Sequence, residues 1–512
     1  MEKHYVDLHC HPSLKPYSKS FKYNPTKQNA LDPNRKNSIW HYSPPNFLEK
    51  FVNRIVTLTK FTQTDLMALA KAKTKVVVVS LYPFEKHFFG NEIIGIKGVT
   101  DVLVNLAASI SQSRMDYIRS NNDYFADLMD EYHYYQQLHN QVVNIDGTIY
   151  TYRLVRNFQD IENNFEAETD TKKIINIVLT IEGGHSFNTG LDMQKDMASR
   201  SEVIGNIKTI KNWEHRPMFI TLAHHFYNEL CGHARSISIG MLKKNQDRGL
   251  NTGITELGVE VIDLLLDNTE GKRIPIDVKH LSTTSRKAYY QLLDTKYNAE
   301  KIPVIASHGA CNGKHSIVQW NKIDISEHAD WFCDIDINFY DEELIRIARS
   351  NGIFGIQLDE RRIGSSKAIS ESKIFFPNKR KQLRKKALLV WRQVQHIAEV
   401  LDKEGLFCWG IQSIGSDFDG IVNPINGLWT AENMKDLAEE MLNHAENYLS
   451  KNLIMLNDFN RIDAEAIVER VMHGNAMELL KEIIEAPQRF FWQLLPRTIF
   501  HIAGRFFWYH KP

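Results

Sequence analysis

The chain of 512 residues contains few cysteines, no net charge and no long apolar run. Its five cysteines are too few for a disulfide scaffold and include no CxxC pair, which favours a reducing compartment. Lys plus Arg and Asp plus Glu both number 62, and this balance argues against a nucleic-acid-binding protein. No run of about 18 uncharged apolar residues indicates a transmembrane segment. The N-terminus has no charged region followed by an apolar one, so we expect no secretory signal and a cytoplasmic location.

Two catalytic motifs are also missing. The chain has no glycine-rich phosphate loop and no GxSxG motif, which argues against a nucleotide-dependent enzyme and against a serine hydrolase. Hydrophobic residues make up 43% and charged residues 24%, as in ordinary globular proteins, so a disordered chain is excluded.

Eight short apolar runs rich in β-branched residues recur along the chain, and each ends in polar or ionisable residues. They are Tyr5–Cys10, Lys75–Tyr82, Ile174–Glu182, Pro217–His224, Pro275–His280, Pro303–His308, Ile353–Leu358 and Gln412–Asp417. Such runs are typical of strands buried on both faces, and helix-like segments such as Glu256–Asn268 and Asn378–Gly405 separate them. Strands that alternate with helices predict a parallel sheet, and eight of them predict an α/β fold of the closed (β/α)8, TIM-type barrel.

The remaining length is assigned to long connections and a tail. Residues 1–485 are expected to form one barrel whose insertions, Pro12–Thr74 and Tyr82–Ile174, lie at its rim. Residues 486–512 form an aromatic, basic tail that is too short and too charged to span a bilayer. We expect the tail to pack on the barrel or on a second subunit of a homodimer; peripheral contact with a membrane is the less favoured alternative.

Ionisable side chains collect at the carboxyl ends of the predicted strands, where the active site of a parallel barrel forms. A single histidine at such a position is more often structural than a ligand. Here the candidates come from six strand ends, and imidazole and carboxylate groups together suit zinc or a similar metal. A glutamate between histidines further suits a pair of metals, so the pattern favours a binuclear metal site. The candidates are His9, His11, Glu182, His224, His280, His308 and Asp417.

The segments around these residues resemble the membrane (renal) dipeptidase family of zinc peptidases, within the amidohydrolase superfamily. The similarity runs from Val6 to about Ile484, and Glu182-Gly183-Gly184-His185 and Asp417-Phe418-Asp419-Gly420 are its most specific parts. The other matching segments are Asp7–His11, Thr221–His224, Ile276–Ser282, Pro303–His308 and Gly474-Asn475.

The resemblance implies a role for each candidate. Glu182 would bridge two zinc ions, with His9, His11 and Asp417 at one ion and His280 and His308 at the other. His224 would contact the substrate and stabilise the developing oxyanion, while Asp417 would transfer the proton of a water to the leaving amine. The implied activity is cleavage of an amide bond, in a dipeptide or similar small substrate, by a hydroxide that bridges the two metals.

Two positions depart from the family's pattern. The family usually has aspartate where this chain has His11, which leaves the metal pair more positive. The family also holds the substrate carboxylate with an arginine after the sixth strand, but residues 309–338 contain none. Lys314 is one substitute and the pair Arg361-Arg362 is another, unless these arginines pair with the neighbouring Asp359 and Glu360. The alternatives are therefore another amidohydrolase-type hydrolase, with a lactone or deaminase substrate, and a catalytically silent barrel that acts as a binding protein.

Overall fold

A parallel sheet forms the centre of the protein. The structure is a computed structural model, and it describes residues 4–20, 31–56, 61–89, 109–237, 245–317, 325–373, 378–420 and 423–485. Eight strands follow one another in the order β1-β2-β5-β6-β7-β8-β9-β10, and each neighbouring pair along this path is parallel. Their bounds are β1 Tyr5–Cys10, β2 Thr74–Leu81, β5 Lys172–Glu182, β6 Ile220–Thr221, β7 Ile276–Asp277, β8 Ile305–Gly309, β9 Ile353–Ile356 and β10 Gln412–Ile414. The predicted α/β class with a parallel sheet is confirmed.

The first and last strands of this order are joined just beyond the end of β10. The backbone N–H of Asp417 donates to the carbonyl of His9 at 2.9 Å, and the N–H of His11 donates to the carbonyl of Phe418 at 3.0 Å. Cys10 and Phe418 form a parallel bridge there. The carboxyl end of β1 therefore lies beside the segment that follows β10.

The sequence of β2 shows why these strands are buried on both faces. Its valines alternate between two apolar clusters: Val77 and Val79 pack in the larger one, whereas Val76 and Val78 pack in a smaller one with residues of α19 (Asn475–Ile484). Each face of the strand thus buries its own set of β-branched side chains, which matches the near-continuous apolar run in the sequence.

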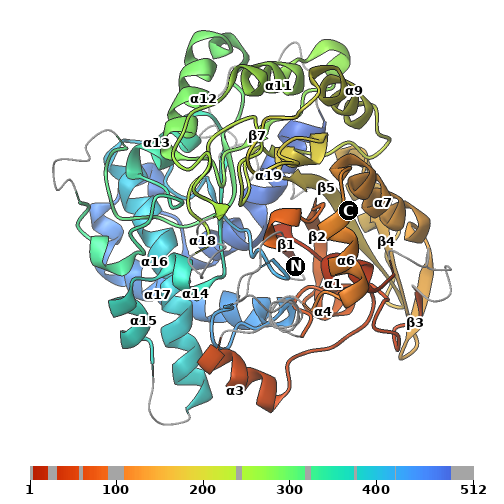
Figure 1. Cartoon of the computed structure of the whole chain (residues 1–512). Helices are drawn as coiled ribbons and strands as arrows, with labels where there is room; N and C mark the ends of the chain where they lie inside the picture. Colours follow the sequence, from red (N-terminus) through yellow and green to blue (C-terminus); the bar gives the residue numbers. More distant parts are fainter. Residues whose placement is uncertain are drawn as a thin grey trace.

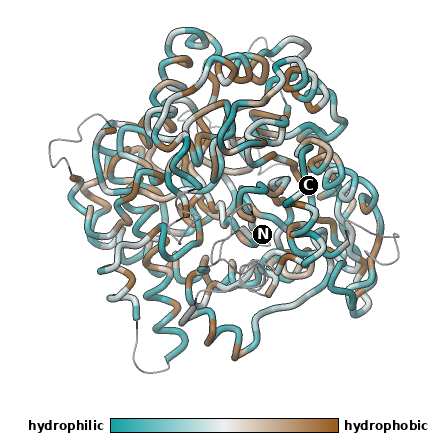
Figure 2. Tube along the Cα trace, in the orientation of Figure 1, coloured by the Kyte–Doolittle hydropathy of each residue, from teal (hydrophilic) through white to brown (hydrophobic). Residues whose placement is uncertain are grey.

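Helices surround the strands. Figure 1 shows α9, α11, α12, α13 and α16 ranged around them, and the outer helices alternate hydrophilic and hydrophobic turns, as expected when one face is buried (Figure 2). The helices are α1 Leu14–Ser20, α3 Phe47–Val56, α4 Leu66–Lys71, α6 Gln112–Ser120, α7 Tyr124–Leu138, α8 Phe158–Glu166, α9 Arg200–Lys211, α11 Glu256–Leu266, α12 Thr283–Thr295, α13 Asp341–Arg349, α14 Glu360–Ile363, α15 Ser366–Glu371, α16 Lys379–Lys403, α17 Met434–Asn452, α18 Ala464–Glu469 and α19.

The long connection between β2 and β5 contains structure that the sequence analysis did not predict. Besides α6, α7 and α8, it holds an antiparallel hairpin of β3 (Val142–Ile145) and β4 (Thr148–Leu154). The turn uses Asp146 and Gly147, both with positive φ, and β4 continues the sheet by pairing in parallel with β5.

None of the helices in the described ranges is long and apolar enough to cross a membrane. The predicted tail, residues 486–512, lies outside the described residues.

Candidate metal centre

Glu182, the last residue of β5, lies at the centre of five imidazole rings. Its Oε2 is 3.1 Å from Nε2 of His11, and its Oε1 is between 3.4 and 3.6 Å from Nε2 of the other four histidines, His9, His224, His280 and His308. The Glu182 residue is only 3% exposed. A carboxylate with both oxygens facing imidazole nitrogens from several strands is suited to contact two cations at once.

Asp417 joins the same cluster from the segment after β10. Its Oδ1 lies 3.8 Å from Nε2 of His9 and 3.6 Å from Nε2 of His11. Its Oδ2 accepts a hydrogen bond from Nε2 of Gln357 at 2.7 Å. Gln357 therefore fixes one carboxylate oxygen and leaves the other directed at the histidines; the sequence analysis missed this residue.

The backbone is unusual where it delivers these side chains. His280 and Asp417 have φ values of +66° and +58°, in the left-handed region that non-glycine residues rarely adopt. Such conformations cluster at functional sites, where surrounding contacts hold them in place. Gly183 follows Glu182 with φ +100°, and a Cβ there would lie 2.2 Å from Nδ1 of His185, so only glycine fits this turn.

A bulge in β1 helps to direct its histidines. Asp7 pairs with Val77 and Cys10 with Val79, so three steps along β1 match two steps along β2. Leu8 accordingly packs in the smaller apolar cluster and Cys10 in the larger one, although they are two residues apart. Bulges often change the direction of side chains next to active sites. Strand alternation alone did not reveal this irregularity.

Hydrogen bonds to Nδ1 orient two of the rings. Nδ1 of His11 lies 3.1 Å from the carbonyl oxygen of Ser80, and Nδ1 of His308 lies 2.9 Å from Oγ of Ser307. Ser307 in turn donates to Oδ2 of Asp277 at 2.6 Å. In both rings the Nε2 atom is left to face Glu182, an arrangement that metal-binding histidines commonly show.

Burial and the neighbouring carboxylates act in opposite directions on the pKa values of the histidines in the cluster. Burial lowers the pKa of His280 to about 3 and also lowers the pKa of His308 well below its usual range. For His11, burial has the opposite effect to the nearby Asp417 and Glu182 carboxylates, which prevail and raise its pKa to about 10. Neutral imidazoles can ligate a metal directly, whereas a cation at His11 would first have to displace a proton.

The residues present fit a metal pair. Two groups of ligand atoms share Glu182, and in each group the atoms lie within 4.8 Å of one another: His9, His11 and Glu182, and Glu182, His280 and His308. A third group is His9, His308 and Asp417. Both ring nitrogens of His9 and Nδ1 of His280 are buried without a hydrogen-bond partner among the described residues. Of these, Nε2 of His9 faces Glu182 and Asp417, and an orphaned nitrogen beside two carboxylates is what zinc or a similar cation would satisfy.

His224 differs from the other histidines because a carboxylate holds its second nitrogen. Nδ1 of His224 lies 2.7 Å from Oε2 of Glu85, a buried residue that also accepts from the N–H of Phe226 at 3.1 Å. Burial opposes protonation of His224, but Glu182 and Glu85 prevail and raise its pKa. Glu85 follows the end of β2 by four residues; the sequence analysis did not name it, although its place beyond a strand end was a usable signal.

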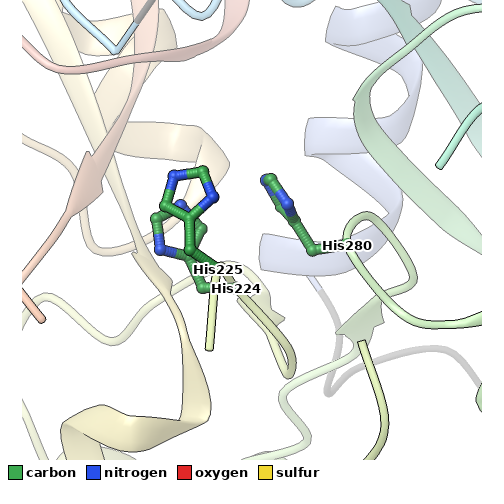
Figure 3. A group of neighbouring side chains, drawn as sticks. All are labelled: His224, His225 and His280. Atoms are coloured by element: carbon green, nitrogen blue, oxygen red, sulfur yellow. The ribbon is translucent and has the colours of Figure 1, made fainter. Parts of the chain in front are cut away.

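A second histidine stands beside His224. The ring centroids of His224 and His225 are 3.8 Å apart, and that of His225 is 5.4 Å from that of His280. Figure 3 shows His224 and His225 together on one side and His280 facing them. Ring nitrogens of these three histidines form a further group of candidate ligand atoms. The sequence analysis assigned no role to His225.

The three basic residues predicted to bind substrate have different surroundings. Arg361 forms an ion pair with Asp359 at 3.0 Å, and Lys314 forms one with Asp334 at 2.6 Å. Arg362 instead donates through Nη2 to the carbonyl oxygen of Ser236. Since Oγ of Ser236 lies 2.6 Å from Nδ1 of His225, Arg362 is connected to the cluster through one residue.

One buried cation was not predicted at all. Lys279 precedes His280, is 1% exposed, and its Nζ has no hydrogen-bond partner among the described residues. Burial and, next, the charge of Arg362 lower the pKa of Lys279 to about 7, although Asp417 acts in the opposite direction.

Known structures provide an independent view of the fold. The dipeptidase AC, a metallopeptidase, is similar to this chain with a TM-score of 0.51 and 14% sequence identity, over 95% of this chain and all of that one (100%). The chain shares its fold with the dipeptidase AC. For the fold, this finding confirms the resemblance to metallo-dipeptidases that the sequence predicts.

Two other structures are less similar. A metallopeptidase from Rhodobacter sphaeroides, liganded with a phosphinate mimic of the dipeptide L-Ala-D-Ala, has a TM-score of 0.49 and 13% identity, over 94% of this chain and 99% of that chain. The probable dipeptidase PvdM from Pseudomonas aeruginosa has a TM-score of 0.44 and 14% identity, over 83% of this chain and 89% of that chain. No protein-family model and no curated protein matches the chain.

Proposed function

We propose that this protein is a metal-dependent hydrolase with two zinc ions that cleaves the amide bond of a dipeptide or a similar small substrate. The observation that carries the proposal is the position of Glu182, whose two oxygens face five imidazoles and belong to two ligand groups. In this proposal the eight parallel strands form a closed (β/α)8 barrel within residues 1–485, with the site at the carboxyl ends of its strands.

Glu182 would contact both ions. His9, His11 and Asp417 would complete one position, and His280 and His308 the other. Bound zinc would lower the pKa of a coordinated water to near neutrality and polarise the substrate's carbonyl group.

Asp417 is the proposed general base and acid. Gln357 holds Oδ2 of Asp417, so Oδ1, which has two lone pairs, is the oxygen left both to contact the metal and to accept the proton of the attacking water. The same oxygen would then deliver that proton to the leaving amine. A carboxylate fixed through one oxygen keeps its other oxygen in one orientation during both steps.

His224 is the proposed electrostatic stabiliser of the transition state. The carboxylates of Glu182 and Glu85 raise the pKa of His224 and so favour its protonated form, in which Nε2–H is available to donate to the oxygen on which negative charge develops. Donors that are already in position make this contact without reorganisation when the charge appears.

A substrate with a free carboxylate would need a cation at the rim. Arg361 and Lys314 each have a carboxylate partner, whereas the guanidinium of Arg362 has only the carbonyl of Ser236 as its hydrogen-bond acceptor among the described residues. We assign the contact with the substrate carboxylate to Arg362. That the dipeptidase AC carries this name and shares the fold supports a peptide-like substrate.

A substrate panel tests the proposal. Zinc-loaded protein should hydrolyse dipeptides, and D417N and H224Q should each lower kcat about 100-fold or more while the protein stays folded. His133 is exposed on α7, so H133Q is a matched histidine substitution that should leave the rate unchanged. Hydrolysis of lactones or deamination of amino-substituted bases in place of dipeptide cleavage would replace the substrate assignment. Absence of turnover on every class would favour a binding protein.

A further inference from the structure

Gln246 has an amide group whose orientation is determined by its partners. Its Oε1 accepts a hydrogen bond from the backbone N–H of Ile237 at 3.0 Å, and its Nε2 donates to the carbonyl oxygen of His225 at 2.9 Å. A backbone N–H can only donate and a carbonyl can only accept, so the amide cannot be flipped. The second hydrogen on Nε2 is then donated to Oγ of Ser236 at 2.7 Å.

This donation fixes the direction of the next hydrogen bond. Ser236 Oγ already accepts from Gln246, and its own hydrogen has one acceptor within reach in the described part of the chain, Nδ1 of His225 at 2.6 Å. If Nδ1 carried a hydrogen instead, the hydroxyl hydrogen of the buried Ser236 would have no acceptor, which costs free energy. The Ser236 hydroxyl therefore donates to Nδ1, and His225 carries its hydrogen on Nε2.

The Nε2–H of His225 is left for a group outside the protein. No described residue accepts a hydrogen bond from it, and the His225 side chain is only part-buried. A ring nitrogen of His225 lies within 4.8 Å of ring nitrogens of His224 and His280, which places this histidine at the candidate metal centre (Figure 3).

We propose that His225 is a second hydrogen-bond donor to the substrate, beside His224, and that it is not a metal ligand. A nitrogen that carries a hydrogen has no lone pair for a metal, but it can donate to the substrate oxygen on which negative charge develops. The relay Gln246–Ser236–His225 sets this tautomer, and Arg362 holds the carbonyl of Ser236. The identity of the acceptor rests on the proposed function, whereas the tautomer does not.

The tautomer is tested first, without any substrate. Protein labelled with ¹⁵N-histidine should show the His225 signals, identified as those lost in H225Q, with hydrogen on Nε2 and none on Nδ1. In S236A the donor to Nδ1 is gone, so a fraction of His225 should carry its hydrogen on Nδ1. Hydrogen on Nδ1 in the wild-type protein would overturn the relay.

Metal content and kinetics then separate a donor from a ligand. The H225L and H225Q variants should bind as much zinc as the wild-type protein; loss of one equivalent in both would overturn the proposal, since His225 would then be a ligand. With a dipeptide, H225L should lower kcat about 100-fold with little change in KM, and H225Q, which keeps an N–H donor, should retain more of the rate. An unchanged kcat in H225L would refute the contact with substrate. If wild-type protein cleaves no dipeptide, the proposed function fails, while the tautomer and the zinc content still decide between donor and ligand.

Discussion

Replacing Lys279 with methionine should stabilise the metal-free protein, and the gain should depend on pH. The Nζ of Lys279 is buried without a hydrogen-bond partner among the described residues, next to a cluster that already contains several histidines. Methionine has nearly the same length and carries no charge, so K279M removes the cost of a buried ammonium while it fills much the same space.

The size and the sign of the effect follow from the pKa. Burial lowers the pKa of Lys279 from its usual 10.5 to about 7, and this interval corresponds to roughly 5 kcal/mol. Between these two pH values the native state binds fewer protons than the unfolded state, so the stability of the wild-type protein rises with pH. Below about pH 7 both states are protonated and the whole cost is present. The advantage of K279M should therefore decrease by about 3 kcal/mol between pH 6 and pH 9.

Urea unfolding in the presence of a chelator measures this difference. Midpoints and slopes for wild-type protein and K279M at pH 6, 7.5 and 9 give the two free energies of unfolding at each pH. Lys314 forms an ion pair with Asp334 and is part-exposed, so K314M is the matched control, and its effect should not change with pH over this range. A constant difference between K279M and wild-type protein at all three pH values would refute the reasoning.

Three further substitutions test separate parts of the account. E85Q should lower dipeptide hydrolysis roughly 10- to 100-fold with unchanged zinc content, because Glu85 holds the ring of His224 and belongs to none of the candidate ligand groups among the described residues. Burial lowers the pKa of His215 to about 4, so the native state binds fewer protons than the unfolded state between pH 4 and about pH 6.5. The free energy of unfolding of the wild-type protein should therefore fall as the pH falls through that range. In H215N this decrease should be smaller, as urea midpoints at pH 5 and pH 7 would show. A Cβ on Gly415 would lie 1.9 Å from the carbonyl oxygen of Ser307, so G415A should lower the free energy of unfolding by about 1–3 kcal/mol. The control is G205A on α9, where a Cβ would have nothing within 4 Å, and it should not be destabilised.

The sequence predicts the parallel sheet well because a strand buried on both faces is a near-continuous run of apolar, β-branched residues. The run Tyr5–Cys10 coincides with β1, and Lys75–Tyr82 differs from β2 by one residue at each end. Pro217–His224 is longer than β6, which has only two residues, Ile220–Thr221. The hairpin of β3 and β4 also had a signal, the Asp146-Gly147 turn between alternating apolar residues, which went unused.

The candidate metal ligands could be predicted for a different reason. Strand ends are identifiable in the sequence, and the topology of a parallel sheet brings their side chains to one edge, so His9, Glu182 and Asp417 meet although they are far apart in the chain. Their partners also lie just beyond strand ends, but position alone does not reveal which side chain they contact. Gln357 contacts Asp417 and Glu85 contacts His224 through tertiary packing, which the sequence pattern around either residue does not specify. The tautomer of His225 depends on Gln246, 21 residues away.

The most direct test of the central claim is the zinc content of the purified protein and of two variants. Glu182 belongs to both proposed metal positions, whereas His308 completes one of them. We expect about two zinc ions per chain in the wild-type protein, about one in H308A and almost none in E182Q, because a neutral amide cannot serve as the shared anionic ligand. Two equivalents that persist in E182Q would contradict the bridging role of Glu182. No bound zinc in the wild-type protein, even after incubation with excess metal, would contradict the metal centre itself.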